Sequence, residues 1–421
     1  MTLPPILAAL RRHKAGVILI ALQIALTLAI VCNAIFIIGQ RVERIGRPTG
    51  MEENNLFQIA QLWVGAPTGD DQGTIDKLDA MQVEDVATLR NLPDVESAVA
   101  ISSLPLSGNN WSGGIRLKPD QKEGSAHASF YFGDWQMLHT LGLRLVAGRD
   151  FTAQDQTHSG FRAKINPPVV IISKALADKL FPNGNAVGKS IYLDKEVPPS
   201  TIIGVVDRMQ TPTIDSWAKD FAFNSILVPN RIDANFSSYA VRAKPGRADA
   251  AMKKARDALF AANPMRVIEM GGTYEDDSIH SFADIRAHAY KADRGMAILM
   301  GVICVILLAV TGAGIVGLTS FWVGQRHKQI GVRRALGARK IDILRYFQTE
   351  NLLIAGGGAI AGIILAVGLN LWLMQRYEMD RMPVLYVLAG VAVVLALGQA
   401  AVFAPARRAA NVPPVVATRT V

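Results

Sequence analysis

Cysteine is almost absent from this sequence of 421 residues, which contains only Cys32 and Cys304. Both lie inside long apolar stretches, so residues 40–294 contain no thiol. A disulfide framework or a cysteine zinc site needs several thiols in one domain. Neither is therefore expected in this central segment.

Charged side chains are missing from four long stretches of the chain. Roughly 20 apolar residues form a helix long enough to cross a bilayer, and each stretch has at least 21 residues. The alternative, buried helices of a soluble core, does not account for four uncharged stretches of this length. The sequence therefore predicts transmembrane helices over residues 15–39, 295–324, 351–374 and 384–404.

The first stretch follows a basic flank that ends at Lys14, as a secretory signal peptide does. However, its apolar run is longer than a signal-peptide core, and no small-x-small cleavage site closes it. Val31 stands where a lipoprotein signal has a small residue before its cysteine. We expect a retained signal anchor.

Acidic side chains are nearly absent from three segments that flank the apolar stretches. Residues 1–14, 325–347 and 405–421 together hold thirteen Lys or Arg and a single acid, Asp342. Their net charge is +12, whereas the whole chain carries +9, so all other residues sum to −3. Loops rich in Lys and Arg stay on the cytoplasmic side. Because the basic excess follows membrane topology, it does not indicate a nucleic-acid partner.

The predicted fold class is an α-helical membrane protein with four transmembrane helices, plus a large α+β extracytoplasmic domain between the first and second helices. Both termini are expected in the cytoplasm. The remaining parts are a cytoplasmic N-terminus (1–14), the extracytoplasmic domain with a helical stalk (40–294), a cytoplasmic loop (325–350), a short outer turn (375–383) and a cytoplasmic tail (405–421).

Short apolar runs and amphipathic segments alternate in the outer domain without a fixed repeat. Residues 169–172 predict a buried strand, and Ser173 is a suitable N-cap for a helix that ends at Leu180. Further strands are expected over 191–193, 201–206, 225–228 and 239–242, helices over 83–91 and 247–262, and stalk helices over 40–47 and 284–294.

Motifs typical of enzymes are absent. Residues 184–190 read Gly-Asn-Ala-Val-Gly-Lys-Ser, but a phosphate-binding P-loop needs four residues between its glycines and joins a strand to a helix. His127, His139 and His158 are scattered and form no metal motif, and no Gly-x-Ser-x-Gly is present. Trp111 and Trp135 are predicted to belong to the aromatic core, with a binding cleft as the alternative. We expect no catalytic residue, metal or cofactor in this chain.

The four apolar stretches also lack the intramembrane charges that transporters with a polar path require. Small residues recur instead, with the spacing small-x-x-x-small at Ala313/Gly317 and at Gly358/Gly362. Such pairs let helix backbones approach closely. We therefore predict that these stretches pack against other helices, although glycine is also generally frequent in membrane helices.

The loop 325–350 is the most specific segment of the sequence. Residues 330–336 predict a short helix, Gly337 an αL stop, and Lys340 the start of a helix that enters the third span. A basic loop lying on anionic lipid is the alternative. A rigid connection of this kind is suited to transmitting a push from a cytoplasmic partner.

The run Gln329–Ala338, the downstream Phe347 and Glu350, and the tail Pro405–Pro414 resemble the FtsX/MacB-type permeases of ABC transporters. The outer domain resembles the MacB periplasmic core domain in Tyr131-Phe132, 143–150, 170–173, 180–182, 186–189 and 203–206. Two positions depart from the family: Gln329 stands where a glutamate is frequent, and the tail 415–421 carries no acid.

The resemblance implies a non-catalytic permease subunit in the bacterial inner membrane that forms a homodimer or heterodimer. It implies a cytoplasmic ABC ATPase, which binds ATP and Mg²⁺, in a separate chain because no Walker motif occurs here. Whether a periplasmic adaptor takes part stays open. The coupling helix that contacts the ATPase would comprise Ile330, Gly331, Val332, Arg333, Arg334, Ala335, Leu336 and Gly337.

Three functions stay open from the sequence. The first is a permease that relays ATP-driven motion to its outer domain for efflux or for peptide or lipoprotein handling. The second is a transmembrane signalling protein that regulates an extracytoplasmic enzyme, and the third is a membrane-anchored assembly protein without an ATPase. The sequence does not identify a substrate.

Overall fold

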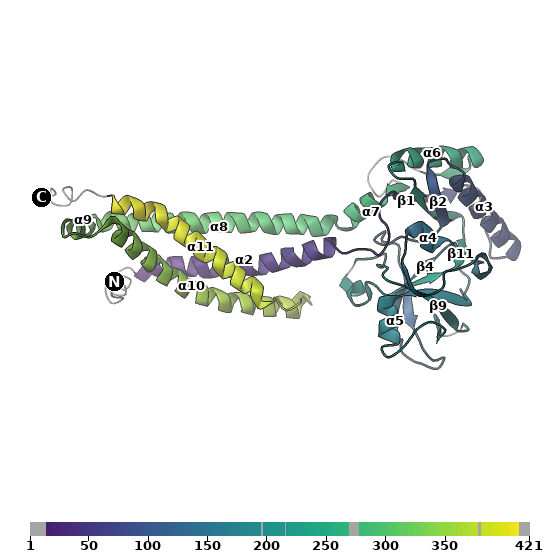
Figure 1. Ribbon diagram of the computed structural model, residues 1–421, viewed down its shortest axis with the longest axis horizontal. Helices are drawn as coiled ribbons and strands as arrows, with labels where there is room; N and C mark the ends of the chain where they lie inside the picture. Colours follow the sequence, from purple (N-terminus) through teal and green to yellow (C-terminus); the bar gives the residue numbers. More distant parts are fainter. Residues whose placement is uncertain (1–13, 195–196, 215, 269–277, 378–379, 412–421) are drawn as a thin grey trace. The chain divides into compact units, whose positions relative to one another are not determined.

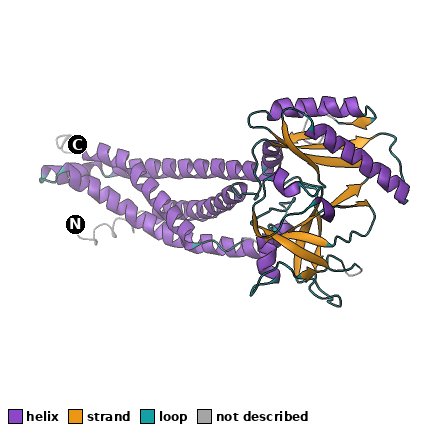
Figure 2. Ribbon diagram, turned by 45° about the vertical axis from the view of Figure 1, so that its right-hand side comes forward, coloured by secondary structure: helices purple, strands orange, loops and turns teal. Residues whose placement is uncertain are grey.

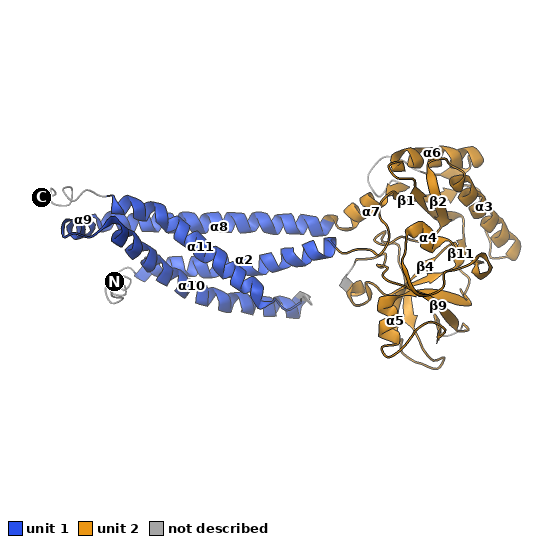
Figure 3. Cartoon of the chain, viewed as in Figure 1, with its two compact units in different colours: residues 1–46, 292–421 blue, residues 47–291 orange. Residues whose placement is uncertain are grey.

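The computed structural model describes residues 14–194, 197–214, 216–268, 278–377 and 380–411 (Figure 1). The chain forms two compact units (Figure 3). The membrane unit comprises Met1–Gly46 and Ala292–Val421, and the outer unit comprises Arg47–Lys291. The strands lie in the outer unit, and the described part of the membrane unit is built of helices (Figure 2).

Four long helices make up most of the membrane unit, and each is long and apolar enough to cross a membrane. They are α2 (Lys14–Ile45), α8 (Lys291–Gln325), α10 (Lys340–Tyr377) and α11 (Val384–Ala410), with the short α9 (His327–Ala335) between α8 and α10. Each contains one of the predicted apolar stretches. The prediction of four such helices with an α+β domain between the first two is confirmed.

Helix α2 packs against α10 and α11 through buried apolar side chains. Ile24, Leu28 and Cys32 of α2 share one cluster with Ala359 of α10 and Val394 of α11. Two hydrogen bonds add polar contacts: Asn33 of α2 donates to the carbonyl of Ala366, 3.1 Å away, and the hydroxyls of Thr27 and Thr311 lie 2.7 Å apart. Neutral polar pairs of this kind hold helices together where lipid provides no hydrophobic drive.

Both α2 and α8 continue beyond their apolar stretches, as the predicted stalk requires. Arg41 of α2 forms an ion pair with Asp293 of α8, and Arg44 lies 3.7 Å from the same carboxylate. The predicted helix 284–294, however, is divided in two. Helix α7 (Phe282–Ala289) ends at Tyr290, whose buried hydroxyl accepts a hydrogen bond from Gln210, and α8 begins at Lys291.

The first sheet of the outer unit has the strand order β13-β1-β12-β2, with β14 also paired to β1, and it is antiparallel. Helices α3 and α6 pack against it with Val86, Leu89 and Leu259 over Tyr239 and Val241. The elements are β1 (Leu56–Trp63), β2 (Val95–Ala100), β12 (Phe236–Ala243), β13 (Arg266–Val267), β14 (Ile279–Ser281), α3 (Gln72–Arg90) and α6 (Ala248–Ala262).

The second sheet is mixed, with the order β3-β4-β10-β7-β9-β5 and β8 paired to β9. Leu176 and Leu180 of α5 pack on its buried residues Val170, Ile202 and Ile226. A third, two-stranded sheet pairs β6 with β11 in parallel. The elements are β3 (Trp111–Ile115), β4 (Ala126–Phe132), β5 (Leu145–Gly148), β6 (Thr157–Gly160), β7 (Val169–Ser173), β8 (Ser190–Ile191), β9 (Ser200–Val206), β10 (Ser225–Val228), β11 (Asn230–Asp233), α4 (Met137–Leu141) and α5 (Lys174–Leu180).

Several local predictions for the outer unit are confirmed. Strand β7 covers 169–172, and the hydroxyl of Ser173 accepts from the Leu176 amide at the start of α5. The strands predicted over 201–206, 225–228 and 239–242 lie in β9, β10 and β12. The strand predicted over 191–193 ends at Ile191, and α3 begins eleven residues before the predicted Val83 because Asp71 caps it.

Candidate functional site

Residues 326–339, which we call the α9 loop, join α8 to α10 in the membrane unit. Helix α9 begins at His327, three residues before the predicted start, and Gly337 beyond its end has a φ of 98°. The amides of Gly337 and Ala338 donate to the carbonyls of Arg334 and Arg333. This pair of bonds is the Schellman motif, which needs a residue with positive φ. The predicted αL stop at Gly337 is therefore confirmed.

One side of the α9 loop is fixed to the membrane unit. Ile330 is buried in a cluster with Ile343 and Phe347 of α10. The guanidinium of Arg333 lies over the ring of Tyr346, 5.1 Å from its centroid. These contacts hold α9 against the first turns of α10, so a force on α9 reaches a membrane helix directly.

A buried ion pair joins the start of the α9 loop to α10. Nη1 of Arg326 donates to both carboxylate oxygens of Glu350, at 3.0 and 2.8 Å. The two side chains are 11% and 3% exposed. Because one partner follows the last residue of α8 and the other lies in α10, the pair sets the separation of these helices.

The opposite side of α9 is open and largely apolar. Val332 is 52% exposed and Leu336 is 82% exposed, and the exposed Ala335 lies between them on the same side of the helix. We call these three residues the α9 face. Exposed basic residues lie before and after it in the sequence, namely Lys328, Arg339 and Lys340, and Arg333 is also exposed, with its guanidinium over Tyr346.

The eight predicted coupling residues thus divide between the two sides. Ile330 and Gly331 are buried, and Arg334 is half-buried with its guanidinium donating to the Ala338 carbonyl. The exposed members are Val332, Arg333, Ala335, Leu336 and Gly337.

The two predicted small-residue pairs lie in different surroundings. A Cβ on Gly358 would lie 2.8 Å from the Ala21 carbonyl, and one on Gly362 would lie 3.0 Å from that of Ala25. This pair therefore lies directly against α2. Ala313 and Gly317 of α8 are exposed, and among the described residues nothing lies within 4 Å of a Cβ built on Gly317.

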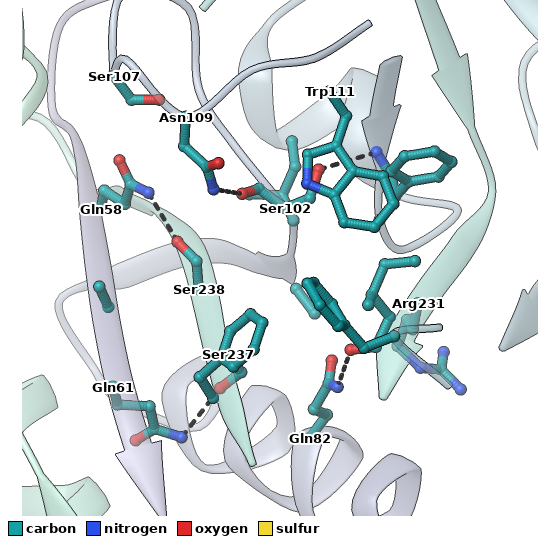
Figure 4. A pocket seen from close by; sticks show the side chains of 18 of the residues that line it. Gln58, Gln61, Gln82, Ser102, Ser107, Asn109, Trp111, Arg231, Ser237 and Ser238 are labelled. Carbon is teal, nitrogen blue, oxygen red and sulfur yellow. Dashed lines mark hydrogen bonds between the residues drawn. The ribbon is translucent and has the colours of Figure 1, made fainter. Parts of the chain in front are cut away.

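The outer unit contains a pocket of about 350 Å³ where the two large sheets meet the β6–β11 pair (Figure 4). Gln58, Ala60 and Gln61 of β1, Ser237 and Ser238 of β12, and Gln82 of α3 form part of its lining. Trp111 of β3, Phe132 of β4, Phe161, and Arg231 and Ile232 of β11 form another part.

Trp111 packs against the apolar core of the second sheet, as predicted, and it also lines this pocket, which was the alternative. Its ring makes edge-to-face contacts with Phe132 and Phe161, with centroids 5.2 and 5.5 Å apart, and Phe161 contacts Phe236 in the same way at 5.2 Å. Such contacts fix the ring orientations. Trp135 is half-buried and does not line the pocket.

A buried ion pair lies beneath the pocket. Arg266 binds both oxygens of Asp85, each at 2.9 Å, and their side chains are 1% and 2% exposed. Gln61 and Tyr239 donate further hydrogen bonds to the same carboxylate. Gln61 belongs to both the pocket lining and this network, so the network orients part of the pocket wall.

Asp79, His158 and Asp233 lie beside the pocket with side-chain atoms within 4.8 Å of one another. These are metal-ligand types, and the scattered histidines of the sequence did not reveal the cluster. However, both oxygens of Asp79 accept hydrogen bonds from the Arg231 guanidinium, at 2.7 and 3.0 Å. A cation already occupies that carboxylate, so the arrangement favours an ion-pair network over a metal site.

Asp233 gives this network a pH-dependent contribution to stability. Burial, reinforced by the charge of Asp79, raises the pKa of the Asp233 carboxyl from 3.8 to about 6, against the opposing effect of the hydrogen bond to His158. Between these values the folded chain holds a proton that the unfolded chain has released. The stabilisation is therefore complete below about pH 4 and is lost as the pH rises through 6, by up to ~3 kcal/mol.

We expect Asp233→Asn to remove this dependence. The melting temperature of the variant relative to wild type should rise between pH 4.5 and 7.5, by about 5 °C or more. Scanning fluorimetry of the full chain measures it, with His158→Gln separating the histidine's contribution. An unchanged difference across this range would show that Asp233 has an ordinary pKa.

Comparison with known proteins agrees with this architecture. Residues 19–258 match the MacB-like periplasmic core domain, and residues 301–414 match the FtsX-like permease C-terminal domain. The macrolide export ATP-binding/permease protein MacB of Chromobacterium violaceum is 28% identical over 65% of this chain and 40% of its own length. The probable syringafactin export ATP-binding/permease protein SyfD of Pseudomonas syringae is 27% identical over 85% of this chain and 50% of its own.

The chain thus spans about half the length, or less, of these curated relatives. Among solved structures, the periplasmic region of MacB from Actinobacillus actinomycetemcomitans aligns with 58% of this chain and 97% of its own, at 18% identity and a TM-score of 0.34. The first domain match alone covers more than half of the sequence. The chain therefore belongs to the MacB/FtsX family of ABC-type exporter permeases, as a multi-pass membrane protein with a periplasmic domain.

Proposed function

We propose that this chain is the permease subunit of an ABC transporter whose ATPase is a separate cytoplasmic chain that contacts the α9 face. The observation that carries the proposal is the exposure of Val332 and Leu336 on a helix whose other side is buried. An apolar patch flanked in sequence by basic residues is typical of a protein–protein contact. Contact with lipid headgroups is a poorer explanation of this exposed face, because the Arg326–Glu350 pair fixes the start of α9 and the turn at Gly337 fixes its end.

The geometry supports transmission of motion along the membrane unit. Force on α9 reaches α10 through Ile330 and Arg333, and it reaches α8 through the Arg326–Glu350 pair. At the other end of α8, Asp293 is paired with α2. Because the apolar stretches carry no charge, a relay to the outer unit fits them better than a polar solute path.

In this proposal the permease is a dimer in the bacterial inner membrane, with both termini cytoplasmic and ATP and Mg²⁺ bound by the partner chain. Export, or the handling of peptides or lipoproteins, takes place at the outer unit. The exported compounds in the names of the relatives, a macrolide and syringafactin, support export as the class of activity. A periplasmic adaptor is compatible with this arrangement.

Co-purification of the ATPase tests the contact. We expect Arg333→Glu with Leu336→Asp to reduce the amount of ATPase recovered with the permease at least tenfold, because a charge enters the apolar face and a basic neighbour is reversed. The matched control is Arg333→Lys with Leu336→Met, which keeps charge and apolarity and should retain the ATPase. Equal recovery with both double variants would refute the assignment of α9.

A transmembrane signalling role uses the same mechanics and is distinguished by its partner. An enzyme bound to the outer unit, with activity that follows ATP hydrolysis, would favour it. Normal cellular activity without any partner ATPase would instead favour an assembly protein.

A further inference from the structure

We propose that the pocket of the outer unit binds an uncharged, peptide-type ligand. The backbone amides of the ligand contact one wall of the pocket, and one apolar side chain of the ligand contacts the other wall. This goes beyond the contact at α9, and it rests on the proposed function only for its biological role as cargo recognition. Binding itself takes place in the outer unit and is measurable without an ATPase.

The size of the pocket suits part of a small peptide. Its volume of about 350 Å³ lies at the lower end of the range of ligand sites. Such a volume accepts one bulky side chain and the adjoining backbone, and it does not enclose a large molecule. A longer chain would therefore leave the pocket at one or both ends.

The described lining offers no unpaired charge to a ligand. It includes no Asp, Glu or Lys, and its one histidine, His280, already interacts with another group. Arg231 is its only arginine, and its Nε and Nη2 both donate to Asp79. Asp85, beneath the pocket, is already bound by Arg266. Because an unpaired ligand charge would lose its hydration without compensation, the pocket selects neutral groups.

Several polar groups of the lining keep unused hydrogen-bonding capacity. Gln58 donates to Ser238, Gln82 donates to the Ile232 carbonyl, and Asn109 donates to the Ser102 carbonyl. In the part of the chain that the structure describes, the amide oxygens of these three residues accept no hydrogen bond, and the indole N–H of Trp111 has no acceptor. Among the same described residues, the amide NH2 groups of Gln58 and Asn109 each keep a second N–H, and Ser238 keeps its O–H. The pocket therefore presents both acceptors and donors, and this combination suits the N–H and C=O groups of a peptide backbone.

Part of the polar lining lies apart from Trp111, whereas Ser102 and Arg231 lie on the same side of the pocket as its ring. In Figure 4, Gln58, Ser238 and Asn109 lie together across the cavity from Trp111. Phe161 and Phe236 keep 44% and 43% of their surface exposed, so their rings offer apolar area to an incoming group. A peptide separates polar and apolar groups in a matching way, because its N–H groups lie along the backbone and an apolar side chain projects to one side. A saccharide carries hydroxyls around its whole ring and would place some of them against the aromatic wall.

Calorimetric titration of the full chain in lipid nanodiscs tests the proposal. The probe is acetyl-Ser-Phe-Ser-amide, and the comparison compounds are acetyl-Ser-Ser-Ser-amide, acetyl-Asp-Phe-Asp-amide and maltose. We expect the probe to bind at least tenfold more tightly than each comparison compound. Trp111→Leu and Phe161→Ser should each weaken the probe about tenfold, whereas Trp217→Leu, at an exposed tryptophan outside the lining, should not.

The outcomes of this titration do not depend on the outcome of the ATPase co-purification that tests α9. Stronger binding of maltose, or of the charged peptide, would overturn the assignment of ligand class. Probe binding that is absent, or equal in the Trp111, Phe161 and Trp217 variants, would overturn the pocket itself. Gln58→Leu gives a second test because it removes one acceptor from a half-buried position, and it should weaken the probe severalfold while leaving ATPase recovery unchanged.

Discussion

Glu350→Ala is expected to abolish recovery of the partner ATPase, although residue 350 is 2% exposed and not part of the α9 face. The substitution leaves the guanidinium of Arg326 buried beside an empty carboxylate site. Breaking a buried pair in this way costs about 3–5 kcal/mol. Because Arg326 is the first residue of the α9 loop, we expect this cost to appear as local opening of the loop, which then no longer presents the α9 face.

Limited trypsin digestion distinguishes this opening from loss of a direct contact. Cleavage after Arg333 or Arg334 should accelerate strongly in Glu350→Ala, because these peptide bonds are protected only while α9 is helical. Glu350→Gln keeps the shape and one acceptor and should give an intermediate rate. If ATPase recovery falls while trypsin sensitivity stays at the wild-type level, Glu350 acts by some means other than positioning the loop.

The Arg326–Glu350 pair also shows which kind of contact the sequence does not reveal. The stop at Gly337 is a local event, encoded within a few residues, and it is predictable. The partner of Glu350, in contrast, lies 24 positions earlier, beyond a helix and a turn. Arg326 is one of seven basic residues in segment 325–347, and nothing in the sequence marks it as the one that is buried.

The membrane helices were predictable because their signal, like the stop at Gly337, is local in the sequence. The absence of charge over more than 20 residues is a property of composition and needs no knowledge of partners. Which side of each helix packs inward does depend on partners. Gly358 and Gly317 have the same spacing motif, yet one lies against α2 and the other is exposed.

The pocket was the hardest feature to predict. Trp111 lies in a short strand, Trp111–Ile115, that contains two glycines, and Phe161 lies 50 residues further along the chain. Their approach depends on the pairing of β3 with β4 and of β6 with β11. Strand β1 was missed because Gln58 and Gln61 interrupt its apolar pattern. The structure shows that Gln61 is buried and satisfied by Asp85, Ser237 and Arg266, so a polar residue there is part of the core.

The largest effect on folding is expected from Asp85→Ala in that core. The carboxylate receives hydrogen bonds from Arg266, Gln61 and Tyr239. Removing it leaves a buried guanidinium, 1% exposed, without its counter-charge. The expected loss is about 3–5 kcal/mol, equivalent to roughly 10 °C or more in the melting temperature of a unit of this size.

Two further variants test whether the burial of the Asp85–Arg266 pair causes this loss of stability. Asp207→Ala removes a similar pair, Arg144–Asp207, but there the side chains are 74% and 44% exposed, so the melting temperature should hardly change. Asp85→Leu with Arg266→Met replaces the buried pair with apolar side chains and should recover most of the lost stability, because the pair itself gains little over good packing. Peptide binding should nevertheless stay weak in this double variant, since Gln61 would lose two of its partners at the pocket wall. Recovery of stability together with full binding would show that the network stabilises the outer unit without orienting the pocket.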